Sequence, residues 1–353
     1  MPNFTSVALL PFFTALVATT ILTFLAIPLI KKFGLIDDPK LHKHPAIIHT
    51  KPIPRGGGIP LYLGALFAAL FFLPFNQTTF AIFFAAFLAL GIGLIDDKFN
   101  AKSKDISPYF RTLVQILAAV IVVASGVNIQ FITSPFGSGV LHFNTILADF
   151  ISVLWLVWVM NMLNWSKGVD GQMPGIVAIS AIVIGILSLR LNPTGQGGFV
   201  DAQLSFIIAG TAIGFLFFNF YPAKIFPGFG ATSLYLLLGV ASILTSAKLA
   251  TAILVMGVPL VDFMFTIIRR ILSKKSPFHG DKKHLHHILL TLGYNQRQIA
   301  LFYWSISGIL GMLSFLLESR SKVFAILMVI AITGGSLLFL HSITNKKNEK
   351  LTS

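Results

Sequence analysis

The chain has 353 residues, of which 55% are hydrophobic and only 11% are charged, and its mean hydropathy is +0.84. A water-soluble globular protein carries about 25% charged residues, so this composition excludes the soluble class. The chain has no cysteine, which excludes disulfides, thiolate metal sites and a cysteine nucleophile. The formal net charge is +14. Because the basic residues lie between apolar segments, we interpret them as topology signals and phosphate ligands and expect no nucleic acid partner.

Apolar segments of the length that a bilayer requires, about 17 to 25 residues, recur along the whole chain. The sequence therefore predicts an all-α, polytopic membrane protein with about eleven transmembrane helices, some of them shorter where protein encloses them. The expected spans are residues 7–30, 58–75, 79–95, 112–127, 146–163, 173–189, 203–219, 233–246, 249–271, 299–317 and 323–340. The first span has no basic residue before it and no small-residue cleavage site after it, so we expect a retained helix.

Lys and Arg residues are distributed unevenly over the connections. The odd-numbered connections and the C-terminal tail hold 22 of the 26, and the other four are Arg190, Lys248, Arg320 and Lys322. Since cytoplasmic connections keep the positive charge, we expect the N-terminus outside and the C-terminus in the cytoplasm. We expect residues 1–345 to form one membrane domain and residues 346–353 a short basic tail.

Two adjacent carboxylates, Asp96 and Asp97, follow the apolar segment 79–95. Such a pair is either a solvated helix end or a site that holds a cation or takes a proton. The chain has only 12 acidic residues, and Lys98 is the one basic residue beside the pair in sequence. These facts favour the second interpretation, a site that holds a cation or takes a proton.

The first connection, 31–57, contains Lys51 and Arg55 ahead of three glycines, 56–58. Glycines let a backbone approach a ligand closely, and the two cations suit phosphate oxygens. A positive-inside loop closed by turn residues explains the same pattern without a ligand.

The connection after span 146–163 is short and polar. Asn161 and Asn164 lie three residues apart on one helical face, and Lys167 and Asp170 follow among glycines. The amides can cap a helix end, or the segment can form a nucleotide or sugar pocket.

The connection 218–233 contains Asn219, Phe226 and Phe229 among prolines and glycines. Its aromatic rings suit the stacking of a base, and they equally suit a membrane-interface belt.

The connection 272–298 contains His284, His286 and His287 beside lysines. Two imidazoles can ligate zinc, but crowded imidazoles and lysines suit anionic phosphate oxygens better, and a solvated charge run is the third interpretation.

Taken in order, these motifs resemble the polyprenyl-phosphate N-acetylhexosamine-1-phosphate transferase family. The resemblance extends from residue 34 to residue 293 and rests on five signatures in the family order. They are Asp-x-Pro with Pro-x-Pro-Arg-x-Gly-Gly, Gly-Leu-Ile-Asp-Asp, Asn-x-x-Asn with Gly-x-Asp-Gly, Asn-x-x-Pro-Ala-Lys-x-Phe, and His-Leu-His-His. The last resembles the branch that initiates glycans from UDP-N-acetylglucosamine, related to phospho-N-acetylmuramoyl-pentapeptide transferase.

The resemblance implies a multi-pass enzyme of the bacterial cytoplasmic membrane. It would transfer a sugar-1-phosphate from a UDP-sugar to polyprenyl phosphate and release UMP, starting a wall or surface glycan. Partners would be the UDP-sugar, polyprenyl phosphate and the bilayer, and a homodimer stays open. A non-catalytic scaffold that binds lipid phosphate or nucleotide is the alternative, and a transporter would need ionisable residues near the membrane midplane.

The resemblance also implies roles for single residues. Asp96 would be the base or a metal-side carboxylate, with Asp97 as its neighbour. Asp170, Asn219 and Phe226 would hold the uridine, Phe226 by stacking on the uracil. The other expected substrate contacts are Lys51, Arg55, Asn161, Asn164, His284, His286 and His287.

Two positions depart from the family pattern. Lys167 and Phe229 stand where the family has Asp, and the resemblance implies Mg²⁺ held by such acids together with Asp96 and Asp97. Two carboxylates lost and one ammonium gained make the site more positive by about three charges, which weakens divalent-cation binding. We therefore expect Lys167 to share in catalysis and to lie within salt-bridge reach of Asp96 or Asp97.

Overall fold

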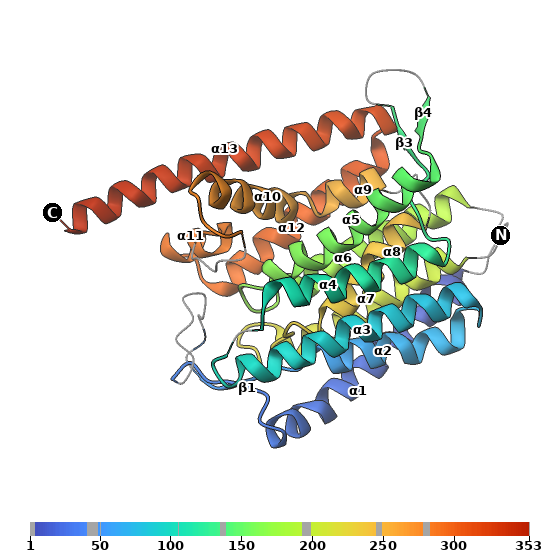
Figure 1. Cartoon of the computed structure of the whole chain (residues 1–353), viewed down its shortest axis with the longest axis horizontal. Helices are drawn as coiled ribbons and strands as arrows, with labels where there is room; N and C mark the ends of the chain where they lie inside the picture. Colours follow the sequence, from blue (N-terminus) through green and yellow to red (C-terminus); the bar gives the residue numbers. More distant parts are fainter. Residues whose placement is uncertain are drawn as a thin grey trace.

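The computed structural model describes residues 4–40, 49, 51–104, 106–134, 139–192, 199–244, 249–277 and 283–352. Long helices running side by side form the body of the molecule, and two small antiparallel ribbons lie at its ends (Figure 1). The first ribbon pairs β1 (Ile36–Asp37) with β2 (Ile53–Pro54), and the second pairs β3 (Phe131–Thr133) with β4 (Val140–His142). The expected all-α membrane class is therefore confirmed.

The helices begin with a π-helical turn, η1 (Thr5–Leu9). The α-helices are α1 (Leu10–Lys32), α2 (Gly58–Phe72), α3 (Gln77–Asn100), α4 (Pro108–Ala124), α5 (Thr145–Trp165), α6 (Gln172–Leu191), α7 (Val200–Asn219), α8 (Thr232–Ile243), α9 (Leu249–Val255), α10 (Gly257–Leu272), α11 (Leu285–Thr291), α12 (Gln296–Leu316) and α13 (Ser319–Thr352).

Each of the eleven expected spans coincides with a helix or, at 249–271, with the bent pair α9 and α10. Within the described ranges, seven helices are long and apolar enough to cross a membrane, or eight if the bent pair is one span. Helices α2, α4 and α8 have only 15, 17 and 12 residues. The structure thus supports a multi-pass membrane protein, and the count of eleven crossings stays a prediction.

Local signals explain where several helices begin. Asn76, Asn144 and Asn295 are the N-caps of α3, α5 and α12, and each side chain accepts a hydrogen bond from the backbone N–H three residues later. Within a bilayer the helix is favoured because it satisfies every backbone N–H and C=O internally.

Helix α8 occupies the middle of the molecule. All twelve of its residues are buried, and it packs against α3, α5, α7 and α2. Because protein rather than lipid surrounds its ends, their backbone groups can be satisfied by neighbouring chain, so a short helix is tolerated there.

The backbones of three segments meet at glycines. A Cβ on Gly58, at the start of α2, would lie 2.3 Å from the carbonyl carbon of Gly230, just before α8. A Cβ on Gly93 of α3 would lie 2.4 Å from the backbone nitrogen of Gly230. This contact fixes the last turns of α3 against the segment that leads into α8.

The two ends of the bundle differ. In Figure 1 the C-terminus, β1 and α11 lie toward one end, and the N-terminus and the β3–β4 hairpin lie toward the other. The connections at the first end hold most of the Lys and Arg residues, and those at the second end hold few. The acid pair, Lys167 and the three histidines lie at the end that contains β1 and α11.

We predict opposite effects of two alanine substitutions in α3. Gly93→Ala should lower stability by about 1–3 kcal/mol or more, because its Cβ has no space against Gly230. Gly91→Ala is the matched control, since no atom lies within 4 Å of a Cβ built there, and should gain up to ~1 kcal/mol from helix propensity. Thermal unfolding in detergent measures both. Equal stability of the two variants would contradict the backbone contact.

Candidate functional site

Asp96 and Asp97 lie within the last turns of α3, which continues five residues beyond the expected span. Both are almost completely buried, with 1% and 0% of their surface exposed. A buried carboxylate needs hydrogen bonds or an opposite charge. The partners of these two carboxylates come from three other parts of the chain.

Asp97 is held by backbone N–H groups. Its Oδ1 accepts from Phe229 N at 2.8 Å, and its Oδ2 accepts from Gly230 N at 3.2 Å. Gly228 precedes them with φ +68°, and a Cβ there would lie 2.2 Å from Asp97 Oδ2. Position 228 therefore requires glycine both for its backbone conformation and for space.

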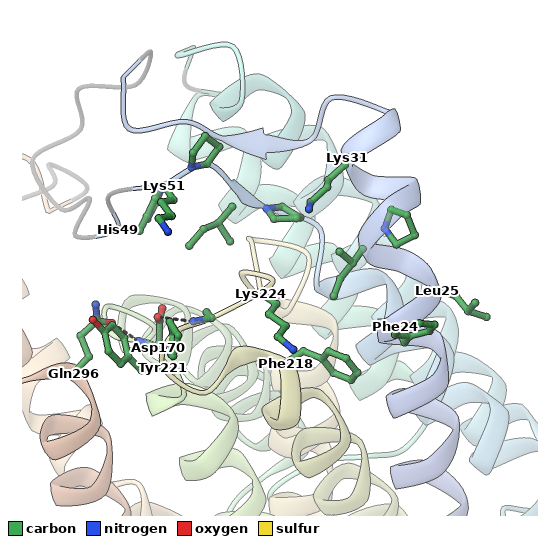
Figure 2. Close-up of a pocket in the computed structure, with 17 residues that line it drawn as sticks. Phe24, Leu25, Lys31, His49, Lys51, Asp170, Phe218, Tyr221, Lys224 and Gln296 are labelled. Carbon is green, nitrogen blue, oxygen red and sulfur yellow. Dashed lines mark hydrogen bonds between the residues drawn. The ribbon is translucent and has the colours of Figure 1, made fainter.

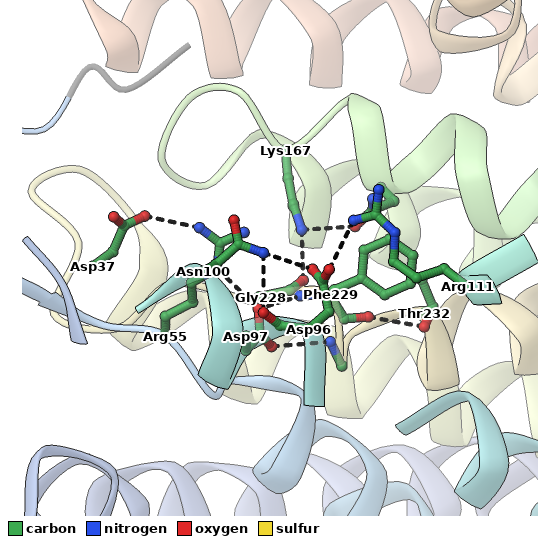
Figure 3. Close-up of polar contacts among 12 residues, drawn as sticks. Asp37, Arg55, Asp96, Asp97, Asn100, Arg111, Lys167, Gly228, Phe229 and Thr232 are labelled. Atoms are coloured by element: carbon green, nitrogen blue, oxygen red, sulfur yellow. Dashed lines mark hydrogen bonds and ion pairs between the residues drawn. The ribbon is translucent and has the colours of Figure 1, made fainter. Parts of the chain in front are cut away.

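Arg55 links two carboxylates (Figure 3). Its Nε donates to Asp97 Oδ1 at 2.9 Å and its Nη1 donates to Asp37 Oδ2 at 2.9 Å. Asp37 ends β1 and faces the strand that leads into Arg55. Asp37 was not expected in the site, although its place in a conspicuous Asp-rich loop was a visible signal.

Arg111 is the second guanidinium of the centre. Its Nη1 donates to Asp96 Oδ1 at 2.8 Å, and Asn100 Nδ2 donates to Asp96 Oδ2 at 2.9 Å. The guanidinium carbon also lies 4.9 Å from the ring centroid of Phe229, a cation–π distance. From the sequence, Lys98 beside the pair and Lys167 were considered as basic neighbours, and Arg111 was not expected as a partner. Its one available signal was a lone Arg inside the apolar helix α4.

Lys167 does not form the expected ion pair. Its Nζ donates to Asn164 Oδ1 and to the Gly228 carbonyl oxygen, both at 2.7 Å, and no ion pair to Asp96 or Asp97 occurs within 4.0 Å among the described residues. That prediction was wrong because Arg55 and Arg111 already occupy the carboxylates. Burial, followed by the charge of Arg55, lowers the pKa of Lys167 to about 7.

The hydrogen bonds of Asp96 and Asp97 decide whether these carboxylates can ligate a magnesium ion. All four oxygens of Asp96 and Asp97 accept hydrogen bonds from N–H groups, two of them from guanidinium. The described ranges contain no cluster of three or more His, Cys, Asp or Glu residues with metal-ligand geometry. A magnesium ion needs oxygen lone pairs and an excess of negative charge. As arranged here, these residues do not fit a magnesium centre.

A cavity of about 760 Å³ lies at the same end of the bundle (Figure 2). Phe24, Pro28 and other apolar residues of α1 form one wall, and the segment 221–224 forms another. Three lysines from separate segments border it: Lys31, Lys51 and Lys224. Pro54 also lines the cavity, and the next residue, Arg55, reaches Asp97.

Asp170 is an acid in the lining of this cavity. Its Oδ2 accepts from Ala223 N at 3.0 Å, and its own N–H donates to Gln296 Oε1 at 3.0 Å. Burial raises the pKa of Asp170 above its usual value, with the Ala223 N–H opposing. Tyr221 and Gln296 border the same space, and neither was expected.

Phe226 lies between the cavity and the charged centre. Its ring is 5.8 Å from the Arg55 guanidinium carbon and 5.8 Å from Lys167 Nζ, and His49 lies 6.5 Å away. Its backbone pairs with the chain around Arg55. The aromatic ring is thus placed where charged groups of a ligand and a flat base would both be within reach.

Two of the expected substrate residues, Asn161 and Asn219, connect parts of the protein. Asn161 Nδ2 donates to Gln115 Oε1 of α4 at 2.8 Å. Asn219 Oδ1 accepts from Gly171 N at 3.1 Å, and its Nδ2 donates to the Ile225 carbonyl at 2.9 Å. Asn219 therefore fastens the segment 166–171 to the segment 220–226.

The three histidines form one cluster beside Lys167. His284 and His286 stack with ring centroids 5.5 Å apart, and His286 and His287 are 4.3 Å apart. The ring of His286 packs directly on Gly168, where a Cβ would lie 1.9 Å from Nε2. Burial and the two neighbouring imidazoles hold the pKa of His286 well below its usual value, so this ring is neutral at pH 7.

Asp262 of α10 orients this cluster. Its Oδ2 lies 2.9 Å from His284 Nδ1, and its Oδ1 accepts from Leu285 N at 3.0 Å. This contact puts a proton on Nδ1 of His284 and leaves Nε2 as the ring's other polar atom. Asp262 was missed in the sequence because it lies inside an apolar helix, 22 residues before the histidine.

The chemistry available at this end of the bundle follows from these contacts. Three cations surround two carboxylates, the histidine cluster lies on one side and a lysine-lined cavity lies on the other. Such a set binds phosphate groups and places a carboxylate base next to them.

We predict that Arg111 and Asp96 are energetically coupled. Arg111→Met leaves a buried carboxylate without its cation and should cost about 3–5 kcal/mol. Adding Asp96→Asn removes the charge and should recover part of that loss. The measure is thermal unfolding in detergent, with Lys102→Met, an exposed residue of the next turn, as control. A double variant no more stable than Arg111→Met would refute the coupling.

Comparisons with known proteins identify a family and several relatives of this chain. A family profile described as "Glycosyl transferase family 4" matches residues 79–246. The chain is 31% identical over 346 residues to the "Probable undecaprenyl-phosphate N-acetylglucosaminyl 1-phosphate transferase" of Bacillus subtilis (strain 168), covering 96% of this chain and 91% of the relative.

Two other relatives carry related names. A "Decaprenyl-phosphate N-acetylglucosaminephosphotransferase" of Mycobacterium leprae is 31% identical over 74% of this chain and 72% of its own length. The "Undecaprenyl-phosphate alpha-N-acetylglucosaminyl 1-phosphate transferase" of Escherichia coli (strain K12) is 27% identical over 85% of this chain and 81% of its own length. Similarity over nearly the full length, together with the acid pair and its cations, makes this chain a member of glycosyl transferase family 4, the family of the polyprenyl-phosphate sugar-1-phosphate transferases.

Proposed function

We propose that this protein transfers N-acetylglucosamine-1-phosphate, or a closely related sugar-1-phosphate, from a UDP-sugar to polyprenyl phosphate and releases UMP. The relatives are named for this kind of transfer. The observation that carries the proposal is the buried pair Asp96 and Asp97, ringed by Arg55, Arg111 and Lys167, with a cavity large enough for a nucleotide at the same end of the bundle.

In this reaction an oxygen of the lipid phosphate forms a bond to the β-phosphorus of the UDP-sugar. The bond between that phosphorus and the bridging oxygen breaks, and UMP leaves with the oxygen. No redox partner is needed. Both substrates are anionic, and one of them is confined to the bilayer, so a cationic centre at the end of apolar helices suits the chemistry.

The cavity is the place proposed for the UDP portion. Phe226 offers a ring for the uracil, and Asp170 offers a carboxyl group to the nucleoside. Lys51 and Lys224, with Lys31, supply positive charge for the diphosphate along the lining. Asn164 and Asn219 act through the protein, by holding Lys167 and the segment 166–171 in place.

Asp96 is the proposed base. Asp97 is fixed by two backbone N–H groups and Arg55, whereas Asp96 is held by side chains only. Arg111 is 23% exposed and can turn from Asp96 toward the phosphate groups of the bound substrates, which frees the carboxylate next to the attacking group. His284, His286 and His287 stand on the other side of Lys167, where they would contact the sugar or its phosphate.

We also propose eleven membrane crossings in the bacterial cytoplasmic membrane, with the site on the cytoplasmic face. The distribution of Lys and Arg supports this orientation. The N-terminus is then outside and the basic C-terminal end inside. Pairing of two copies stays a prediction.

UMP release tests the proposed function. Purified protein with polyprenyl phosphate and a panel of UDP-sugars should release UMP with at least one sugar. Asp96→Asn and Asp97→Asn should each lower the rate by at least ~100-fold, because each removes a charge without changing shape. Glu318→Gln, an exposed acid at the far end of the bundle, is the control. Full activity in both Asp variants would refute these roles, and no UMP release with any sugar would favour a non-catalytic scaffold.

Cysteine labelling tests the orientation, and the cysteine-free chain gives no background. A membrane-impermeant maleimide should label His142→Cys in intact cells, because His142 is exposed on β4. Lys275→Cys, exposed just after α10, should react only after permeabilisation. Labelling of Lys275→Cys in intact cells would reverse the proposed orientation.

A further inference from the structure

We propose that Lys167, with Arg55 and Arg111, forms a cation centre built into the chain that binds the diphosphate of the UDP-sugar without a divalent metal ion. This inference rests on the proposed function and concerns how the same site neutralises phosphate charge. It starts from the donor set described above, in which every oxygen of Asp96 and Asp97 already accepts an N–H hydrogen bond.

The position of the ammonium is the first argument. Lys167 Nζ donates to two neutral oxygens, Asn164 Oδ1 and the Gly228 carbonyl, each at 2.7 Å (Figure 3). An ammonium group has three N–H donors. Among the described residues these are its two hydrogen bonds, so one donor and most of its charge are left for an anion.

Phe229 is the second argument. Its backbone N–H holds Asp97, which any residue could do, while its ring lies 4.9 Å from the Arg111 guanidinium carbon and 5.8 Å from Lys167 Nζ. An aromatic face attracts both cations without neutralising them. A carboxylate at this position would instead pair with one of them. The side chain at 229 therefore contacts two cations without adding a negative charge to the centre.

The charge balance is the third argument. The centre and the cavity contain four carboxylates, from Asp37, Asp96, Asp97 and Asp170. They contain six cationic side chains, from Lys31, Lys51, Arg55, Arg111, Lys167 and Lys224. Two positive charges are left over when all six are protonated. The diphosphate of a UDP-sugar carries about two negative charges, so the chain itself can balance it.

The environment of Lys167 makes its charge responsive to the ligand. Burial and Arg55, with Arg111 from α4, favour the neutral amine, and Asp97 and Asp96 from α3 oppose them, so the pKa is about 7. A phosphate beside Nζ favours the protonated form. Above pH 7, binding must therefore take up a proton, and affinity should fall by up to about tenfold per pH unit.

The test measures binding and turnover separately. UDP-N-acetylglucosamine is titrated calorimetrically into the purified full-length protein in excess EDTA and in excess MgCl2, and UMP release is followed in the same two buffers with polyprenyl phosphate. We expect Kd values within about threefold of each other, UMP release in EDTA, and no protein-bound Mn²⁺ by electron paramagnetic resonance.

Variants separate charge from structure. Lys167→Met keeps the chain length and removes the ammonium, and it should weaken UDP-N-acetylglucosamine binding at least ~10-fold and abolish its pH dependence above 7. Lys102→Met, an exposed lysine near the same end, is the control and should leave both unchanged. The pair Lys167→Asp with Phe229→Asp places two carboxylates in the centre and should create Mn²⁺ binding and a magnesium requirement. Thermal unfolding of each variant identifies any that fails to fold.

The outcomes separate this inference from the proposed function. Turnover or binding that EDTA abolishes and Mg²⁺ restores would overturn the cation centre and leave the transferase intact. If UMP is released in neither buffer from any UDP-sugar of the panel, the proposed function fails. In that case binding alone tests the cation centre. Binding of UDP-N-acetylglucosamine that EDTA does not change and that Lys167→Met weakens would support the cation centre. Any other binding result would overturn it.

Discussion

The buried carboxylate of Asp97 is the constraint on which this end of the molecule depends. A charge with none of its surface exposed is tolerated only with strong hydrogen bonds, and here Phe229 N, Gly230 N and Arg55 supply them. To bring those donors within reach, α3 must touch the backbone at Gly230, and Gly93 makes that approach possible. The same contacts fix the segment that carries Arg55 and, through it, Asp37. The position of Asp97 is thus determined largely by backbone N–H groups, which leaves the identity of the Phe229 side chain open to change.

The segment 166–171 joins the three parts of the site. Lys167 reaches the Gly228 carbonyl in the acid centre, Gly168 lies against His286, and Asp170 accepts from Ala223 at the cavity. Six consecutive residues therefore contact the acid pair's loop, the imidazole cluster and the nucleotide-sized cavity. A displacement of this short segment would change the contacts of all three parts of the site at once. The side-chain amides of Asn164 and Asn219 hold the segment by hydrogen bonds to Lys167 and Gly171.

Hydropathy alone located every long helix, because a bilayer imposes internal hydrogen bonding on each crossing segment. It could not show that α8 needs only twelve residues, since enclosure by α3, α5 and α7 is a tertiary property. The motifs located the acid pair and the histidines, but not their partners. Arg111 is the one charged residue of α4 and Asp262 is the one acidic residue of α10. They lie 15 and 22 residues from the groups they contact, and a single sequence does not reveal such pairs. Lys98, adjacent in sequence, is exposed, and the burial of Asp96 and Asp97 selected more distant guanidinium groups instead.

Helix α13 has 34 residues and is about 51 Å long at 1.5 Å per residue, well beyond the ~30 Å thickness of a hydrocarbon core. Only 6% of its most apolar stretch is buried inside the protein, so lipid forms most of its surroundings. This helix packs on α10, and α10 carries Asp262, the partner of His284. A tilt of α13 that changes with membrane thickness would therefore act on the helix that supports the histidine cluster. A detergent micelle and a native membrane are different mechanical environments for this contact.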